Sequence, residues 1–122
     1  MILGFNKKFV EPIKKGTKIH TIREDSHNRW KLGMKIHFAT GVRSSRYYNF
    51  MMGRCLSTQA IRIVYVDEPI IPQVYVDNSP LKNHEVWELA RNDGFETLAE
   101  FFDWFNQDFS GKIIHWTDFK YV

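Results

Sequence analysis

The sequence contains one cysteine, Cys55, among its 122 residues. A lone cysteine cannot form a disulfide within the chain, and no CxxC pair exists to hold zinc or to carry out redox chemistry. Apolar runs of the roughly 18 to 20 residues that a membrane span requires are also missing. The opening MILGF, followed by Lys7 and Lys8, lacks the order of a secretory signal peptide. We therefore expect a cytoplasmic protein without a membrane segment.

Standard nucleotide-binding and hydrolase motifs are absent too: Walker A, GxGxxG, HExxH and GxSxG do not occur. The five histidines show no ligand-like pairing, so we expect neither a metal site nor a cofactor. An SxxK match at residues 79–82 is too short to be specific, and Ser79 is better explained as a helix cap.

Aromatic residues are abundant, with ten Phe, four Trp and five Tyr in a chain that is 43% hydrophobic. This composition is typical of a globular protein rather than a disordered one. A chain of 122 residues is long enough to bury its own core. We expect a single domain over residues 1–122 with a core rich in rings.

Charge is distributed unevenly, although the net charge is only +3. Residues 1–62 contain thirteen Lys and Arg against three acids, whereas residues 63–122 contain four against eleven. Such asymmetry indicates that one face attracts a polyanion, which favours RNA or a nucleotide as a partner. The alternative is that the two oppositely charged halves attract each other across the fold.

Alternating patterns and turn residues predict strands at both ends of the chain and helices late in it. Strands are expected at residues 2–5, 17–23, 34–40, 57–68, 72–78 and 111–122. Residues 41–54 lack a clean period and are expected to form a long connection or an irregular hairpin.

Helices are predicted from their end signals. Residues 9–15 read as one or two helical turns that end at Gly16. Ser79 as N-cap and Pro80 as the first helical residue predict a helix that stops at Gly94. Thr97 and Glu100 form a capping box that opens another helix. This element order predicts an α+β fold, a small mixed β-barrel with helices packed at one side.

The stretch GTKIHTIR, residues 16–23, carries more polar chemistry than a strand requires. In a regular strand Lys18 and His20 share one face, and Thr21 and Arg23 share the other. Lys18 and Thr21 converge only if the chain is still irregular as it leaves Gly16. The alternative is a solvated lysine at a strand edge and an ordinary β-branched threonine.

Asp93 is predicted at the C-terminus of a helix, where the macrodipole disfavours a carboxylate by roughly 0.3 to 1 kcal/mol. Desolvation there would also raise the pKa of the carboxyl group, which suits proton transfer near neutral pH. The alternative is a solvated turn, because Asn-Asp-Gly is a common turn sequence.

RYYNF, residues 46–50, places an arginine beside three rings. These are the ingredients of a platform that stacks bases and contacts phosphates. The same rings are equally well explained as core anchors of a loop.

Four segments, IKKGTKIHTIRED, RWKLGMKIHF, ELARNDGFETLAEFFDWF and GKIIHWTDF, together resemble the ASCH domain family, a small relative of the PUA fold associated with RNA. The resemblance extends from about residue 9 onward and is weakest over residues 41–56. The family pattern G-x-K-x-x-T-x-R is matched by Gly16, Lys18, Thr21 and Arg23. The aromatic and glycine turn that follows it is matched by Trp30 and Gly33. The helix end of the family is matched by Asp93, Gly94 and Phe95.

The resemblance implies a PUA-like β-barrel with a cleft lined by Lys18, Thr21 and Arg23. In the bacterial members that act as N4-acetylcytidine amidohydrolases, the lysine, the threonine and a glutamate from the later helix end are catalytic. Carried over, this set becomes Lys18, Thr21 and Asp93, with the shorter aspartate in place of the glutamate. Thr21 would attack the amide, Lys18 would accept its proton and Asp93 would orient the groups.

Contacts to the substrate or to RNA are expected from basic and aromatic side chains: Arg23, His20, Trp30, Lys31, Arg43, Arg46, Tyr47 and Tyr48. Two alternatives remain open at this point. One is a binding module for RNA that carries out no reaction. The other is an enzyme that cleaves RNA with Lys18 and His20 as a proton-transfer pair.

Overall fold

The fold is known from a computed structural model that describes residues 1–66 and 72–122. These residues form an α+β protein with eight strands and three α-helices. The strands are β1 Ile2–Gly4, β2 His20–Arg23, β3 Lys35–Thr40, β4 Tyr48–Arg54, β5 Ser57–Val64, β6 Gln73–Val76, β7 Ser79–Pro80 and β8 Phe109–His115. The helices are α1 Val10–Lys15, which follows a 3₁₀ turn at Lys7–Phe9, α2 Asn83–Asn92 and α3 Leu98–Trp104.

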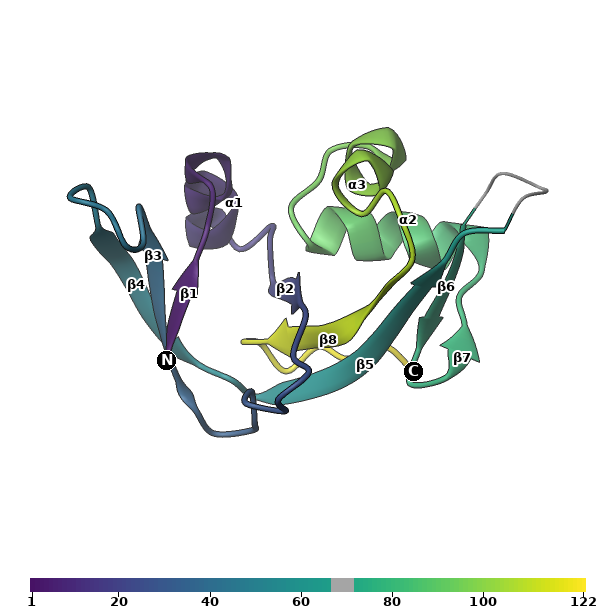
Figure 1. The fold of residues 1–122 in the computed structure, drawn as a ribbon, viewed down its shortest axis with the longest axis horizontal. Helices are drawn as coiled ribbons and strands as arrows, with labels where there is room; N and C mark the ends of the chain where they lie inside the picture. Colours follow the sequence, from purple (N-terminus) through teal and green to yellow (C-terminus); the bar gives the residue numbers. More distant parts are fainter. Residues whose placement is uncertain (67–71) are drawn as a thin grey trace.

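The strands divide into two sheets. The smaller sheet has the order β1-β3-β4, with β1 parallel to β3 and β4 antiparallel to it. The larger sheet is antiparallel with the order β2-β8-β5-β6-β7. Figure 1 shows the two sheets splayed apart like the arms of a V, with α2 and α3 over the larger sheet and α1 beside the smaller one.

The described residues form no closed barrel, so the predicted barrel is wrong, whereas the α+β class is confirmed. The backbone just before β2 is bonded to the helices and not to the smaller sheet. Just before β2, the amides of Thr17 and Lys18 both donate to the carbonyl oxygen of Pro12 in α1, each at 3.0 Å. The amide of Ile19 donates to the carbonyl oxygen of Asn92 in α2, at 2.8 Å. These donors bind helix ends rather than another strand.

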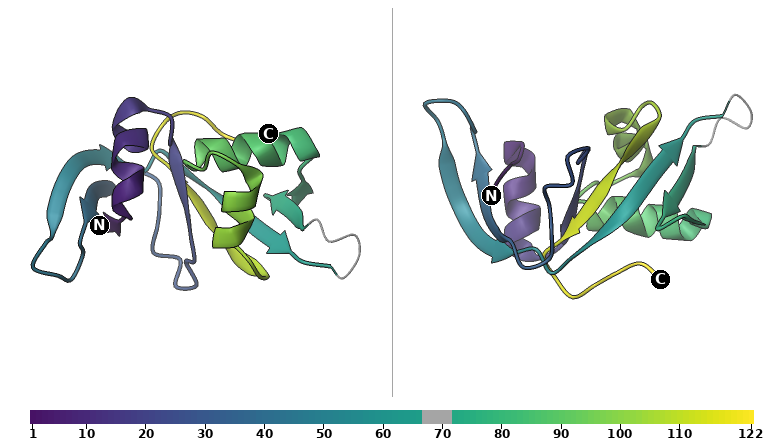
Figure 2. Two further views of the ribbon diagram at one scale, coloured as in Figure 1. Left: turned by 90° about the horizontal axis from the view of Figure 1, so that it is seen from above. Right: turned by 60° about the horizontal axis from the view of Figure 1, so that its bottom comes forward.

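The core is built from buried side chains of both sheets and of all three α-helices, whose arrangement is seen from two further sides in Figure 2. In β5, Ile61 and Ile63 are buried while Arg62 between them is exposed, as the alternating pattern predicts. In the smaller sheet, the rings of Phe38 and Trp116 pack edge to face with centroids 4.8 Å apart. Aromatic burial thus joins the smaller sheet to the segment that follows β8.

The predicted start of α2 is wrong. Asp77 and Asn78 both have positive φ, 49° and 68°, and form a tight turn between β6 and β7. Two left-handed residues of this kind return the chain antiparallel to itself. Ser79 and Pro80 therefore pair with β6 as β7, and α2 begins later, at Asn83.

Other predicted elements are present, but they begin or end at different residues. Residues 41–54 form an irregular hairpin, because residues 48–54 pair with β3 as β4 across a bulge at Phe38 and Ala39. The closing strand ends at His115 rather than continuing to residue 122. Strand β5 ends at Val64, and the last part of the predicted strand, residues 67–68, lies outside the described residues. The Thr97 cap is confirmed, since its Oγ1 accepts from the amide of Glu100 at 3.1 Å.

Candidate functional site

A cavity of about 210 Å³ lies where the two sheets diverge. Its walls come from the segment after β1, the chain around β2, the end of α2 and the end of α3. The lining residues are Gly4, Phe5, Asn6, Phe9, Lys18, Thr21, Ile22, Arg23, Asp93, Phe95, Trp104 and Phe105. The cavity therefore brings together Lys18, Thr21, Arg23 and Asp93, which the sequence separates by up to 75 positions.

The irregular segment before β2 explains how Lys18 and Thr21 reach one cavity. Gly16 ends α1 in the left-handed region with φ of 81°, which favours glycine. The next three amides bind helix carbonyls, and regular pairing with β8 starts only at His20. Because Lys18 precedes the regular strand, alternation does not force its side chain away from that of Thr21. The alternative of a solvated lysine at a strand edge is wrong, since Lys18 is only 2% exposed.

Asp93 is buried at the end of α2, so the alternative of a solvated turn is wrong. Lys18 Nζ donates to the main-chain oxygen of Asp93 at 2.5 Å and to Oδ1 at 3.3 Å. Gly94 follows with φ of 94°. A Cβ atom at that position would lie 2.9 Å from Lys18 Cδ and 3.0 Å from Phe9 Cδ1, so glycine is required for this close approach.

The Lys18 ammonium is surrounded by both charge and rings. Burial lowers the pKa of Lys18, while the Asp93 carboxylate opposes that change. Lys18 Nζ also lies 4.7 Å from the ring centroid of Phe9 and 5.7 Å from that of Phe5. An amine whose pKa is lowered in this way exchanges a proton more readily near neutral pH.

Thr21 contacts the second cation of the cavity. Arg23 Nε donates to Thr21 Oγ1 at 3.2 Å, and Arg23 Nη2 donates to the Gly4 carbonyl oxygen at 2.6 Å. The guanidinium also lies 4.9 Å from the Phe5 ring centroid. Burial lowers the pKa of Arg23, and Asp93 opposes the change. Within the described residues no hydrogen bond joins Thr21 to Lys18.

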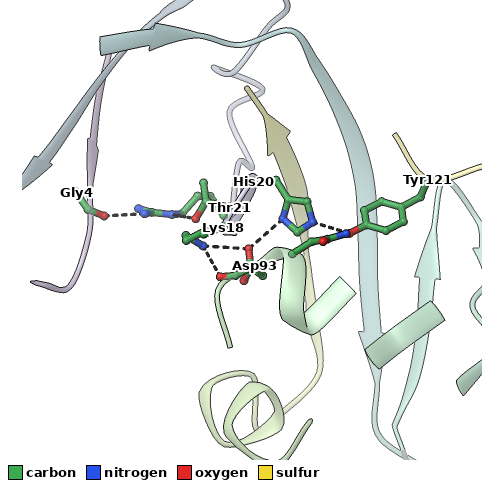
Figure 3. Close-up of polar contacts among 8 residues, drawn as sticks. Gly4, Lys18, His20, Thr21, Asp93 and Tyr121 are labelled. Carbon is green, nitrogen blue, oxygen red and sulfur yellow. Dashed lines mark hydrogen bonds and ion pairs between the residues drawn. The ribbon is translucent and has the colours of Figure 1, made fainter. Parts of the chain in front are cut away.

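Behind Asp93 lies a chain of buried hydrogen bonds that is drawn in Figure 3. His20 Nδ1 is 3.1 Å from Asp93 Oδ1, and His20 Nε2 is 2.6 Å from the Tyr121 hydroxyl. Asn92 Nδ2 donates to the same hydroxyl at 3.1 Å. His20 is fully buried, does not line the cavity and has both ring nitrogens occupied. It is therefore not placed to contact a ligand or to form a proton-transfer pair with Lys18 on bound RNA.

The remaining predicted contact residues lie elsewhere. Trp30 is buried in the core, and its amide donates to Asp25 Oδ2 at 3.0 Å. Lys31 is exposed in the loop before β3. The exposed residues Arg43, Arg46, Tyr47 and Tyr48 lie in and just after the β3–β4 connection. Tyr47 and Tyr48 are 44% and 58% exposed, so they are not core anchors, whereas the third ring of this stretch, Phe50, packs against the core. None of these residues lines the cavity.

Several lining residues and one supporting residue were not predicted from the sequence. The rings of Phe9, Phe95 and Trp104 meet edge to face at the cavity, with centroids 5.5 to 5.7 Å apart. Only the high aromatic content pointed to such a wall. Tyr121 reaches His20 from the segment after β8, and no local pattern marks it.

Among the described residues no group of three or more His, Cys, Asp or Glu side chains is arranged to hold a metal ion. No helix of the described part is long and apolar enough to span a membrane. Comparison of the chain with protein-family models, with curated proteins and with solved structures gives no match.

Proposed function

We propose that the cavity around Lys18, Thr21 and Asp93 binds a modified pyrimidine nucleoside and hydrolyses its N4-acyl amide, in a PUA-like domain of the ASCH type. One observation carries the proposal. A hydroxyl and an amine from the segment around β2 and a carboxylate from the end of α2 line the same small cavity. Amide hydrolysis through a covalent intermediate requires a nucleophile, a proton acceptor and stabilisation of the developing charge, which these groups with Arg23 supply.

The size and walls of the cavity favour a small planar ligand. At about 210 Å³ it lies below the roughly 300 to 1,000 Å³ of typical sites for drug-sized molecules. The rings of Phe9, Phe95 and Trp104 supply faces and edges against which a base can stack. A nucleobase with a short acyl group fits this description better than an extended nucleic acid strand.

The proposed reaction proceeds in two steps. Thr21 Oγ1 attacks the acyl carbonyl carbon, and Lys18 accepts the hydroxyl proton in the fraction of molecules whose amine is unprotonated, a fraction that burial increases by lowering its pKa. That proton passes to the leaving N4 nitrogen as the bond between N4 and the acyl carbon breaks, which releases cytidine and leaves an acyl ester on Thr21. Water then attacks the ester with Lys18 again as base, so that acetate leaves and the hydroxyl re-forms. Arg23, which donates to Thr21 Oγ1, places its positive charge beside the reacting centre and stabilises the negative charge that develops on the acyl oxygen.

Asp93 has a supporting role in this scheme. Its main-chain oxygen and Oδ1 both accept from Lys18, so they aim the amine into the cavity. The carboxylate also stabilises Lys18 while that residue carries the transferred proton within each step. Asp is one methylene shorter than Glu. Because Gly94 has no Cβ atom, the Lys18 side chain can lie close to the end of α2, and this proximity compensates for the shorter side chain of Asp93.

The test is incubation with N4-acetylcytidine, with cytidine and acetate measured by chromatography. Wild type and Thr21→Ser release both products, whereas Thr21→Ala and Lys18→Met lose at least about 10²-fold in kcat/KM. Thr58→Ala, a threonine of β5 outside the cavity, serves as the matched control and retains activity. If wild type and Thr21→Ala are equally inactive on this and related N4-acyl cytidines, the proposal fails.

A second candidate function is binding of RNA by the hairpin of β3 and β4. The observation that favours it is the exposure of Tyr47 and Tyr48 beside Arg43 and Arg46. Its test is the affinity for single-stranded RNA at several salt concentrations. Each neutralised phosphate contributes about −0.7 to the slope of log affinity against log salt. Affinity that does not change with salt, or with Tyr48→Ala, contradicts it.

A further inference from the structure

A line of hydrogen bonds leads from the cavity through Asp93 and His20 to Tyr121 and Asn92, outside the cavity lining. We infer that Tyr121 and His20 are positioning residues that hold the imidazole proton on Nδ1, so that His20 donates to Asp93 and keeps its carboxylate aligned with Lys18. The inference rests on the proposed function for its kinetic consequence, but the proton position can be tested without a substrate.

The direction of each hydrogen bond follows from the groups involved. Asn92 Nδ2 can only donate, so the Tyr121 oxygen accepts from it. The single hydroxyl proton of Tyr121 is then directed to His20 Nε2, 2.6 Å away. Because Nε2 accepts, the neutral ring carries its proton on Nδ1 and donates to Asp93 Oδ1 at 3.1 Å.

The opposite assignment places repelling groups in contact. With the proton on Nε2, the lone pair of Nδ1 would face the Asp93 carboxylate, and neither could donate. A doubly protonated ring is disfavoured because burial lowers the pKa of His20, and the nearby Lys18 lowers it further while Asp93 opposes both. Burial also raises the pKa of Tyr121, so the hydroxyl keeps its proton.

Tyr121 is held in place by its main chain. Its amide donates to Gln59 Oε1 at 2.9 Å, and Gln59 Nε2 donates to its carbonyl oxygen at 2.8 Å. Gln59 Nε2 also donates to Asp77 Oδ2 at 2.9 Å, which sets the orientation of the amide. The Gln59 side chain thus pairs with the backbone of residue 121 much as a neighbouring strand would.

The side-chain amide of Gln59 also determines which ring nitrogen of the second buried imidazole, that of His115, carries the proton. His115 Nε2 lies 2.9 Å from Gln59 Oε1, which can only accept, so His115 carries its proton on Nε2. His115 Nδ1 is buried and has no partner among the described residues, which agrees with a proton on Nε2 because a buried N–H without an acceptor would be costly. The two rings meet edge to face with centroids 5.3 Å apart. Neighbouring histidines are therefore expected to carry opposite tautomers.

The side chains that face His20 come from several parts of the chain. Asp93 approaches from the end of α2, Lys18 from the segment before β2, His115 from β8 and Tyr121 from the segment after β8. With His20 neutral and donating, Asp93 Oδ1 is held between the imidazole and the Lys18 ammonium. Without Tyr121, the ring is free to move its proton to Nε2, and the carboxylate loses a donor.

The experiment is nitrogen-15 NMR of the imidazole rings in the folded protein at pH 7 to 8. We expect a protonated Nδ1 and an unprotonated Nε2 for His20, with the reverse pattern for His115. Assignments come from single His20→Asn and His115→Asn variants. A wild-type His20 ring with its proton on Nε2, or protonated on both nitrogens, overturns the inference.

The variant Tyr121→Phe tests the role of the hydroxyl, with Tyr75→Phe as the matched control because Tyr75 packs on Arg62 away from the chain of hydrogen bonds. We expect Tyr121→Phe to move His20 toward the Nε2 tautomer and to lower kcat about tenfold with KM within about twofold. An unchanged tautomer or an unchanged kcat in this variant contradicts the positioning role. If wild type hydrolyses no N4-acyl cytidine, the proposed function fails, and the spectra alone decide the tautomer assignment.

Discussion

Lys18 and Asp93, 75 positions apart in the sequence, contact each other twice, through the main-chain oxygen of Asp93 and through its carboxylate. Both side chains are almost fully buried. Removing one member of such a pair leaves an uncompensated charge in the interior, which typically costs 3 to 5 kcal/mol. The pair therefore matters to stability as well as to the proposed chemistry.

The variant Asp93→Asn tests this pair, because it removes the charge and keeps the size and the carbonyl. We expect the free energy of unfolding at pH 7 to fall by about 3 kcal/mol in urea titrations. The loss should shrink as the pH rises toward 10. Burial already places the pKa of folded Lys18 below its unfolded value of 10.5, so the unfolded state binds the proton in that window and stability rises with pH.

The double variant Lys18→Met with Asp93→Asn completes the cycle. It removes the buried cation that the single variant leaves behind, so it should be more stable than Asp93→Asn alone. Equal or lower stability of the double variant would contradict a charged, coupled pair.

For Gly94, the glycine that follows α2, Gly33 serves as a matched control. Both have similar positive φ, 94° and 92°, but a Cβ at Gly33 meets nothing within 4 Å, whereas one at Gly94 would lie 2.9 Å from Lys18 Cδ. We expect Gly33→Ala to cost about 1 kcal/mol from backbone strain alone. Gly94→Ala should cost at least about 1 kcal/mol more and reduce turnover, because Lys18 must move. Equal costs in urea unfolding would show that the contact with Lys18 is not tight.

Stability should fall in acid because of the buried histidines. Burial lowers the pKa of His115 from 6.5 to about 4, so between these values the unfolded state binds a proton that the folded state does not. The free energy of unfolding should therefore fall as the pH drops from 6.5 to 4, by on the order of 1 to 3 kcal/mol. His20, whose pKa burial also lowers, acts in the same direction.

Urea titrations at several pH values check this dependence. His115→Gln should flatten the fall between pH 6.5 and 4, while replacement of the exposed His84 in the same way controls for loss of an imidazole. A wild-type stability that is constant or rises toward pH 4 would contradict burial of neutral rings.

Trp104 should matter to ligand binding more than to folding. It is 51% exposed, its ring lines the cavity, and Lys8 Nζ lies 5.1 Å from its centroid. Loss of a stacked ring costs about 1 to 3 kcal/mol per base, so Trp104→Ala should raise KM for the nucleoside about tenfold or more with little change in kcat. Trp87→Ala is the matched control, since Trp87 is 45% exposed under Arg91 and outside the cavity. Equal effects of the two variants would exclude stacking on Trp104.

Local signals predicted the parts of the site that depend on local geometry. Gly16 and Gly94 follow the ends of α1 and α2, as the sequence predicts. Lys18 lies just after the first of these helix ends, and Asp93 lies at the second. The helix start predicted at Ser79 and Pro80 is wrong because a tight turn at Asp77 and Asn78 precedes them. The turn brings Ser79 and Pro80 beside β6, and pairing with that strand outweighs their preference for a helix start.

The rest of the site depends on contacts between distant segments, which no local pattern encodes. His20 looks like a ligand-binding side chain in the sequence, yet Tyr121 occupies its Nε2 from 101 positions away. Likewise, the barrel was predicted from the order of strands and helices and from the family resemblance, and neither specifies which strand edges pair. The backbone donors before β2 bind Pro12 and Asn92, and the described strands form two separate sheets.

The shorter of the two contacts made by the Lys18 ammonium is to a peptide carbonyl at the C-terminal end of α2. Every amino acid carries that oxygen, so exchanging the side chain at position 93 does not abolish it. The orientation of the carbonyl depends instead on its neighbour, Gly94, whose backbone angle other residues rarely adopt. In relatives of this protein, glycine after the helix should therefore be retained more strictly than the identity of the acid before it.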